Sequence, residues 1–340
     1  MKKLLSILLV LSLMFTFAAC SDAGKDRSEI SGADSKAETV QKLDVDCNVF
    51  VLNGPTGMGI APLMKKAENN EGNLNYKINT VAANDEIVAK VVNKEADIAA
   101  VATNVASTLY KKTNGGIKVL AVNTLGVLSV VTKGEEITDI ASLKGKTVYT
   151  TGQGANPEYI INYILSENGL KVGEDVKLEF VSQPQELVTK VATNEKAVVI
   201  APQPVATTIT VKDAAAKIVI DLNDEWEKVS DTKLVMGCVI ATNEYIEKNP
   251  EAVKAFLYDY EESIKALNGD IDTAAQLCAD YGIVAAAPIA KKAIPHCNIV
   301  FEDGKELKTD LSAYLDFLFK ANPKSIGGAL PDDNFYYEAK

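Results

Sequence analysis

Residues 142–158 read SLKGKTVYTTGQGANPE, and this stretch decides the fold. Residues 147–150 are β-rich, and the glycine-rich turn that follows leads into Asn156-Pro157-Glu158. That tripeptide is a strong helix start, because Asn caps the first turn, Pro fits the first helical position and Glu lies near the positive end of the helix dipole. The stretch therefore predicts a strand, a turn and a helix in succession, which is the repeating unit of parallel α/β sheets.

Strands and helices alternate in the same order on both sides of this stretch, as in parallel sheets with crossover helices. The alternation runs from 43 to 125 and restarts at 126, and the composition becomes strongly helical after about residue 241. We predict strands at 48–52, 76–81, 97–101, 117–122, 128–132, 147–150, 176–181, 198–201, 218–222 and 234–241. We predict helices at 60–68, 85–93, 105–112, 156–169, 184–193, 205–212, 249–269, 273–281 and 307–319.

The length of 340 residues exceeds what one hydrophobic core usually holds, so two lobes are expected. The predicted fold class is α/β with two lobes, each a mostly parallel sheet flanked by helices, and a helical C-terminal segment. The predicted divisions are a signal peptide at 1–19, a tether at 20–42, lobe I at 43–125, lobe II at 126–233, and the completion of lobe I with the C-terminal helices at 234–340.

The formal net charge of -11 argues against nucleic acid as a partner, because phosphate backbones are bound by an excess of lysine and arginine. His296 is the only histidine, which leaves little room for histidine-based metal sites or nucleophilic triads. We therefore expect no catalytic residues, no metal site and no cofactor.

The N-terminal segment has the features of a secretory signal. Lys2 and Lys3 precede an apolar run at 4–19, whose 16 residues are fewer than the about 20 that span a bilayer as a helix. The run ends in Phe17-Ala18-Ala19-Cys20, which resembles a bacterial lipobox. We predict that Cys20 is lipidated and anchors the chain at the extracytoplasmic face of the membrane. The alternative is an ordinary cleaved signal with a chance cysteine.

Four further cysteines, Cys47, Cys238, Cys278 and Cys297, lie in the body of the chain. They lack CxxC spacing, which argues against a zinc site, and an exported protein permits disulfides. Three full pairings are open, and we favour Cys238 with Cys297. Small buried free thiols are the alternative.

Several motifs together resemble a known family. They are Ala96-Asp97-Ile98-Ala99, the segment from Ser142 to Val148, Gly152-Gln153-Gly154 before a helix, and Pro202-Gln203-Pro204 after a strand. The chain resembles, over about residues 45–337, solute-binding lipoproteins of ABC importers with the type II periplasmic-binding-protein fold. The group it is most similar to binds sulfonates, taurine, nitrate or thiamine-precursor pyrimidines. The resemblance implies a monomer that closes over a small-molecule ligand and delivers it to permease and ATPase subunits.

Loops that follow strands are the candidate site, because ligands of open parallel sheets bind beyond the carboxyl ends of the strands. Glycines in these loops let backbone N–H groups approach a ligand. The candidate ligand-binding residues are Asn53, Gly54, Thr56, Gly57, Met58, Thr103, Asn104, Asn123, Thr124, Gly152, Gln153, Gly154, Ala155, Gln183, Gln203 and Pro204.

Arginine is almost absent from the chain. Arg27 is the only one, and it lies in the predicted tether. A guanidinium that grips an α-carboxylate through two oxygens is therefore not available in the body. We expect a small ligand that is neutral or singly anionic. The alternative is that a lysine-rich composition has simply replaced arginine everywhere.

Two other classes of function remain open. One is an enzyme on the same fold, such as a pyrimidine synthase or a dehydratase, but His296 lies away from every candidate loop and no carboxylate pair stands in one. The other is a surface receptor or adhesin domain, which would share the lipid anchor and the acidic surface.

Overall fold

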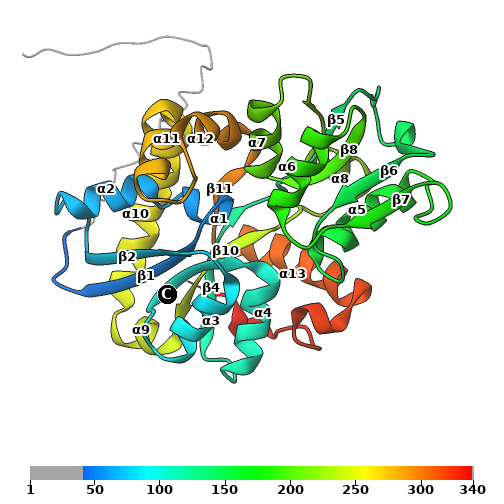
Figure 1. Ribbon diagram of the computed structural model, residues 1–340. Coiled ribbons are helices and arrows are strands. Elements are labelled where there is room, and N and C mark those ends of the chain that lie inside the picture. The colour runs from blue at the N-terminus through cyan, green and yellow to red at the C-terminus, as the bar shows by residue number, and fades with distance from the viewer. Residues whose placement is uncertain (1–40, 339–340) are drawn as a thin grey trace, which may run out of the picture. The chain divides into compact units, whose positions relative to one another are not determined.

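The computed structural model describes residues 41–338, which contain two β-sheets (Figure 1). The predicted signal peptide at 1–19, Cys20 and nearly all of the predicted tether lie outside the described residues. Those predictions stay predictions. Within the described part of the chain, no helix is both long and apolar enough to cross a membrane.

Sheet A has six strands in the order β11-β4-β10-β3-β1-β2. β1 pairs in parallel with β2 and β3, whereas β10 pairs antiparallel with both β3 and β4, so β3 and β4 run in the same direction. β11 pairs antiparallel with β4 at the edge. The strands are β1 (Asp46–Leu52), β2 (Asn75–Val81), β3 (Ile98–Ala102), β4 (Ile117–Thr124), β10 (Gly237–Thr242) and β11 (Ile299–Glu302).

Sheet B has five strands in the order β7-β6-β8-β5-β9. β6 pairs in parallel with β7 and β8, and β5 runs antiparallel between β8 and β9. Its strands are β5 (Leu128–Lys133), β6 (Thr147–Thr150), β7 (Lys177–Phe180), β8 (Ala197–Pro202) and β9 (Lys217–Asp221).

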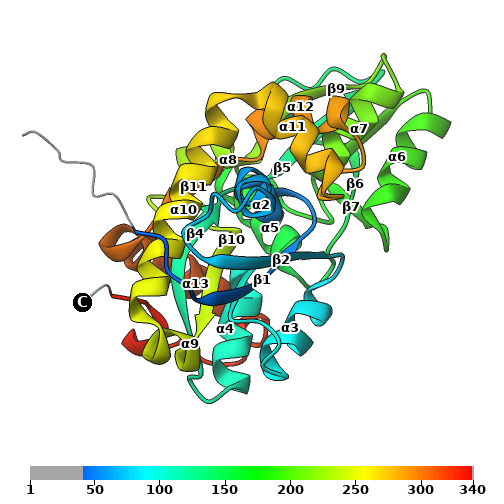
Figure 2. The same ribbon diagram turned by 90° about the vertical axis from the view of Figure 1, so that its left-hand side faces the viewer.

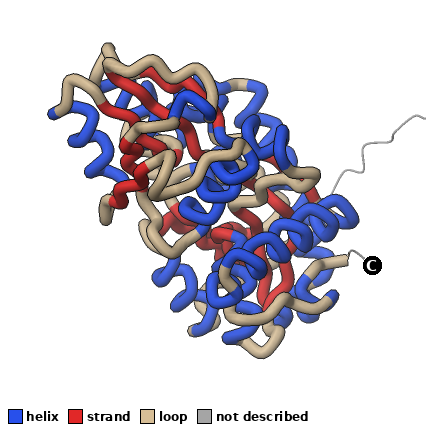
Figure 3. The backbone as a smooth tube through the Cα atoms, turned by 90° about the vertical axis from the view of Figure 1, so that its right-hand side faces the viewer, coloured by secondary structure: helices blue, strands red, loops and turns tan. Residues whose placement is uncertain are grey.

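Helices lie on both sides of the strands in each sheet (Figure 3). On sheet A, α2, α10 and α11 lie on one side, and α3 and α4 on the other (Figure 2). The helices are α1 (Pro55–Met58), α2 (Ala61–Glu68), α3 (Asn84–Val92), α4 (Thr103–Lys112), α5 (Asn156–Glu167), α6 (Pro184–Thr193), α7 (Val205–Lys212), α8 (Leu222–Val229), α9 (Asn243–Lys248), α10 (Pro250–Gly269), α11 (Ile271–Asp280), α12 (Ala287–Ala293) and α13 (Gly304–Ala321). Short 3-10 turns lie at Ala141–Leu143, Ile294–His296, Pro323–Ile326 and Asp333–Phe335.

The predicted fold class is confirmed: two sheets, in each of which most strands run in the same direction, are flanked by helices, and the C-terminal segment is helical. Sheet A takes its strands from Asp46–Thr124 and Gly237–Glu302, and sheet B takes its strands from Leu128–Asp221. The division into lobes at 43–125, 126–233 and 234–340 stays a prediction.

Five elements escaped the sequence analysis: α1, α8, α9, α12 and β11. The predicted strand at 218–222 ends instead at Asp221, whose side chain accepts a hydrogen bond from the Asn223 N–H and starts α8. The predicted strand at 234–241 begins only at Gly237, and residues 234–236 belong to the connection before it. Each missed element is short, so its periodicity is weak.

Sheet A separates two hydrophobic clusters, and this overturns the favoured disulfide. Cys238 on β10 packs in the cluster beneath α3, α4 and α13, whereas Cys297 packs in the cluster beneath α2 and α10. All four cysteines of the described residues are free and buried, so the pairing of Cys238 with Cys297 was wrong and the alternative of buried thiols was right. Burial raises the pKa of the Cys47 thiol to about 12, which keeps it protonated.

An aromatic cluster joins α13 to helices of sheet B. Trp226 on α8 is fully buried, with ring centroids 4.9 Å from Tyr163 on α5 and 4.8 Å from Phe317 on α13. Its indole Nε1–H donates to the Thr232 carbonyl at 2.5 Å, in the connection that leads to β10. The helix α13 (Gly304–Ala321) is thus packed against α5 and α8, which lie far earlier in the chain.

Asp259 on α10 holds the start of β2. It is 2% exposed and accepts hydrogen bonds from the Asn73 N–H at 2.8 Å, the Asn73 Nδ2 at 2.7 Å and the Tyr76 hydroxyl at 2.7 Å. Burial and the neighbouring carboxylate raise the pKa of Tyr76, so the hydroxyl stays a donor. These bonds fix α10 on the edge of sheet A.

Asp259→Ala should therefore lower the free energy of unfolding by about 2–4 kcal/mol, because it leaves three half-buried donors without their acceptor. Urea denaturation followed by circular dichroism measures the change. Asp272→Ala is the control, since Asp272 is 71% exposed beside Lys291, and its stability should not measurably change. Equal stability of the two variants would contradict the structural role of Asp259.

Candidate ligand-binding site

The carboxyl ends of β1, β3 and β4 carry one half of the predicted site residues. Residues 53–58 follow β1, Thr103 and Asn104 begin α4 after β3, and Asn123 and Thr124 end β4. These strands run in the same direction, so their carboxyl ends lie on one edge of sheet A. The structure therefore brings these candidates to a common edge, as the sequence predicted for a ligand site.

Two glycines shape the loop after β1. Gly54 has a φ of 89°, in the region that favours glycine, and its N–H donates to the Ile283 carbonyl at 2.9 Å. A Cβ on Gly57 would lie 2.0 Å from the Leu52 carbonyl oxygen. The loop can therefore turn tightly over the end of β1 only because Gly57 has no side chain. Met58 is fully buried and anchors the turn in the core.

Asn123 ties the end of β4 to this loop. Its Nδ2 donates to the Thr56 carbonyl and to the Tyr260 hydroxyl, both at 2.9 Å, and its Oδ1 accepts from the Thr124 hydroxyl at 3.0 Å. Asn123 is 1% exposed. Thr103 is fully buried too, and its hydroxyl donates to the Val235 carbonyl at 2.8 Å. The polar groups of these side chains are engaged within the protein, and they position the loops.

The loop from 151 to 155 carries candidates at the carboxyl end of β6. Gly152 and Gly154 have φ values of 79° and 71°. The Gly154 N–H donates to Glu158 Oε2 at 2.5 Å, so a carboxylate of α5 already lies on the donor that we expected to face a ligand. The Gly154 carbonyl accepts from the Tyr159 hydroxyl at 2.6 Å. Gln153 and Gly154 are exposed, and Ala155 is half-buried.

Gln203 is the candidate with the most distinctive surroundings. It is 3% exposed at the end of β8, and its Oε1 accepts from the Thr207 hydroxyl at 2.8 Å and from the Thr207 N–H at 3.3 Å. These two hydrogen bonds fix the orientation of the side-chain amide, because Oε1 can accept hydrogen bonds whereas Nε2 can only donate them. Its Nε2 is buried and has no hydrogen-bond partner among residues 41–338. A buried donor without a partner is costly, so this position calls for an acceptor atom.

The remaining candidates differ in exposure. Gln183 is exposed before α6, and its N–H donates to Glu186 Oε1 at 2.8 Å, as in a capping box. Pro204 is half-buried, and its carbonyl accepts from the Thr208 hydroxyl and N–H. Asn53 is exposed and Asn104 is half-buried. Contact of these residues with a ligand stays a prediction.

Sequence reasoning missed several buried polar atoms of sheet B and α5. Ser129 Oγ, Thr150 Oγ1 and Asn156 Oδ1 are buried without a hydrogen-bond partner in the described part of the chain. Ser129 lies directly opposite Ala201 in the ladder of β5 and β8, two residues before Gln203. A single hydroxyl in the apolar run LSVV at 128–131 was the signal that could have found it.

A recess of about 600 Å³ lies near the amino ends of β1, β3 and β4, at the opposite end of these strands from the candidate loops. Asp97, from one of the family-like motifs, lines it. Its carboxylate accepts from the Asn48 N–H at 2.9 Å and the Asn48 Nδ2 at 2.7 Å. Asp97, directly before β3, is therefore bonded to β1, and this structural role accounts for the aspartate in the motif.

Comparison with known proteins places these features in a wider context. A family described as "ABC transporter, phosphonate, periplasmic substrate-binding protein" matches residues 71–292. No curated protein matches the sequence.

Several solved structures share the fold. An ABC transporter protein from Parabacteroides distasonis is 23% identical with a TM-score of 0.74, and the match covers 87% of this chain and 100% of that one. The periplasmic aliphatic sulphonate binding protein SsuA from Escherichia coli is 14% identical with a TM-score of 0.68, covering 88% and 94%. The periplasmic nitrate-binding protein NrtA from Synechocystis PCC 6803 is 14% identical with a TM-score of 0.60, covering 83% of each chain.

Gly57→Ala should lower the free energy of unfolding by about 1–3 kcal/mol, because the added methyl group displaces the Leu52 carbonyl or the whole loop. Thermal unfolding followed by circular dichroism measures this. Gly269→Ala at the end of α10 is the matched control, since no atom lies within 4 Å of its added Cβ, and it should be neutral or mildly stabilising. A neutral Gly57→Ala would show that the loop after β1 is not sterically fixed.

Proposed function

The chain belongs to the family of periplasmic substrate-binding proteins of phosphonate ABC transporters, and from this membership we propose how it binds and delivers its ligand. The match covers residues 71–292 and confirms the resemblance predicted from the sequence. The protein is the substrate-binding component of an ABC importer and works outside the cytoplasm. Its partners are a small-molecule ligand and the subunits of the transporter.

We propose that the ligand is a small organic molecule, neutral or singly anionic. The observation that carries this proposal is the buried Gln203 amide, whose oriented Nε2 has both of its N–H groups free at the carboxyl ends of the sheet B strands. Arg27 is the only arginine of the sequence, so residues 41–338 supply no guanidinium to the candidate loops. The two N–H groups of this one amide suit one or two ligand oxygens. They do not suit a multiply charged phosphate chain.

Singly ionised phosphonates and sulfonates are the first ligands to test. The family description names phosphonate, and the titles of solved structures with this fold name aliphatic sulphonate and nitrate as ligands of those proteins. Each presents oxygens that accept hydrogen bonds. The alkyl group of a phosphonate or sulfonate cannot accept hydrogen bonds, so it would lie against apolar side chains or backbone. The remaining candidates in the loops after β1, β3, β4, β6 and β7 would line the rest of the site.

We propose hinge closure as the mechanism of capture. Two connections join the sheets, at 125–127 and 230–236. The first is held on both sides, because the Gly126 N–H donates to Asn223 Oδ1 at 3.1 Å and the Gly126 carbonyl accepts from Asn298 Nδ2 at 2.6 Å. Rotation about short connections of this kind would bring the carboxyl edges of the two sheets over a ligand. A higher affinity of the ligand for the closed form would drive the motion.

A solute-binding role accounts for these features better than catalysis does. His296 is exposed on the 3-10 turn at Ile294–His296, and the candidate residues supply donors and glycines in place of an acid and a base. We propose that the mature protein acts as a monomer without a cofactor. An enzyme on the same fold is the alternative that turnover of a panel member, tested below, separates from solute binding.

A panel of methylphosphonate, ethanesulfonate, taurine and nitrate should raise the melting temperature for at least one member. A ligand at 100 times its Kd adds about 2.7 kcal/mol to the free energy of unfolding. Gln203→Glu replaces the donor with an acceptor and should weaken binding of an anion at least tenfold by calorimetry. Gln185→Glu, an exposed neighbour on α6, is the control and should bind normally.

Tight binding of a standard amino acid or of a di- or triphosphorylated metabolite would contradict the proposed ligand class. Turnover of any panel member by the purified protein would favour the enzyme. Small-angle scattering should show a smaller radius of gyration with ligand bound, and an unchanged radius at saturation would contradict hinge closure.

We propose that Cys20 carries the lipid that tethers the protein to the membrane. Cys20→Ser should move the protein from the membrane fraction to the soluble fraction, because the acyl chains supply the anchor. Fractionation of cells followed by immunoblotting measures this, and Cys47→Ser is the control with an unmodified anchor. An unchanged distribution of Cys20→Ser would show that the lipobox-like segment is an ordinary signal.

A further inference from the structure

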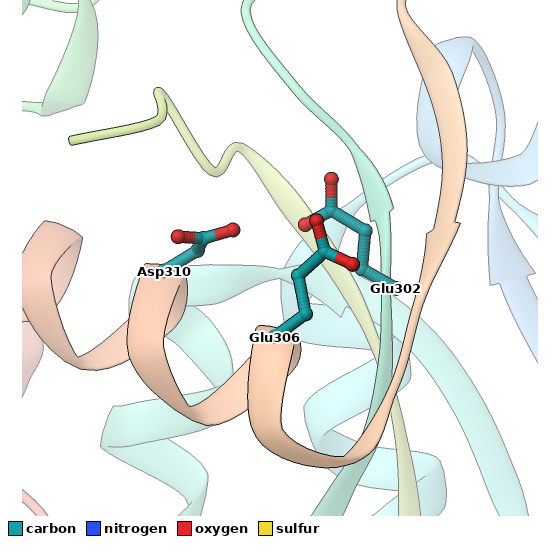
Figure 4. A group of neighbouring side chains, drawn as sticks. All are labelled: Glu302, Glu306 and Asp310. Atoms are coloured by element: carbon teal, nitrogen blue, oxygen red, sulfur yellow. The ribbon is translucent and has the colours of Figure 1, made fainter.

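Three carboxylates, none of them a candidate ligand-binding residue, gather where β11 meets α13. Glu302 ends β11, and Glu306 and Asp310 lie on one face of α13 because they are four residues apart. One oxygen of each lies within 4.8 Å of the others. Figure 4 shows the carboxylates of Glu302 and Glu306 beside each other, with that of Asp310 turned toward them.

Lys233 is the cation that the structure places among them. Its Nζ lies 2.8 Å from Glu302, 2.7 Å from Glu306 and 2.9 Å from Asp310. Burial lowers the pKa of Lys233, but the three carboxylates outweigh this and hold the pKa above its ordinary value. One ammonium therefore faces three acids, which leaves a formal charge of -2 on the group.

Glu302 gives a second, independent sign that the group is incompletely satisfied. Its side chain is 9% exposed, and only Oε1 contacts Lys233. Oε2 is buried and has no hydrogen-bond partner within residues 41–338. A buried carboxylate oxygen without a partner points to a missing cation or donor.

The group is open to an ion from solvent. One recess of about 420 Å³ is lined by Lys233, Glu306 and Asp310 together with Lys305 and Thr309. A second recess, of about 690 Å³, is lined by residues that include Glu302 and Glu306. The Lys233 side chain is 35% exposed, so it can swing out into the first recess without crossing the core.

We propose that Glu302, Glu306 and Asp310 form a calcium site for which Lys233 is the built-in competitor. Calcium prefers carboxylate oxygens at about 2.3–2.6 Å, so two ligands of one ion lie at most about 5 Å apart, and the observed spacing fits. Magnesium demands a smaller octahedron and suits the spacing less well. Water would complete the coordination on the exposed side of Glu306, which is 60% exposed.

Calorimetric titration of the chelator-treated protein with CaCl2 tests the site. The wild type should bind one calcium with a Kd of about 0.1–1 mM, as extracellular sites with few carboxylates do, and magnesium should bind more weakly. Lys233→Met should tighten calcium binding at least tenfold, because the competitor is gone. Lys308→Met on α13 is the control: its side chain is 37% exposed and pairs with Asp333 and Glu338, so calcium affinity should not change.

Glu302→Gln should abolish calcium binding, and Glu306→Gln, at a more exposed position, provides the same test if Glu302→Gln fails to fold. No heat of binding in the wild type or in Lys233→Met would overturn the proposal. Calcium binding by Lys233→Met alone would also overturn it, because Lys233 would then be the permanent counterion. Calcium binding that survives both glutamine variants would place the ion elsewhere.

Discussion

The insertion of β10 between β3 and β4 is the constraint on which the structure depends. Both edges of β10 are paired, so the backbone groups of two inner strands of sheet A are satisfied only after the chain has completed sheet B and returned. This return creates the second connection between the sheets. It also places Gly237 against Asn123 and Thr124, where a Cβ would lie 2.7 Å from Asn123 Oδ1. The carboxyl ends of β3 and β4, which carry candidate residues, are therefore held in place by β10, a strand that comes much later in the chain.

Much of the polar chemistry at these strand ends serves the protein itself. Asn123 and Thr103 hold loops and the return strand, and Glu158 lies on the Gly154 N–H. Gln203 differs, because Thr207 orients its amide while the Nε2 stays without a partner. Asn123, Thr103 and Glu158 therefore hold the loops in place, whereas Gln203 is the candidate residue best placed to bind a ligand. The family membership gives that difference a meaning, since a solute-binding protein needs oriented donors and no catalytic group.

Local signals in the sequence predicted most helices and strands. Contacts between residues far apart in the sequence could not be predicted from it. The Asn156-Pro157-Glu158 start and the helix at 184–193 follow from side chains within one turn, and the structure has both. The order of the strands made the candidate loops meet at sheet edges. The group of Lys233, Glu302, Glu306 and Asp310 could not be predicted, because its members are separated by up to 77 residues and meet only through β11. The predicted disulfide was wrong for the same reason. The face of sheet A toward which a cysteine points depends on the register of strand pairing, which the sequence does not show.

The position of Trp226 has a consequence for how the protein can be observed. It is the only tryptophan of the chain, and its ring lies between helices of sheet B and the C-terminal helix that follows sheet A. Any rotation of one sheet against the other changes the dielectric surroundings of this single indole. The unlabelled protein therefore carries its own fluorophore at the joint, and its emission maximum reports on movement there without an attached dye.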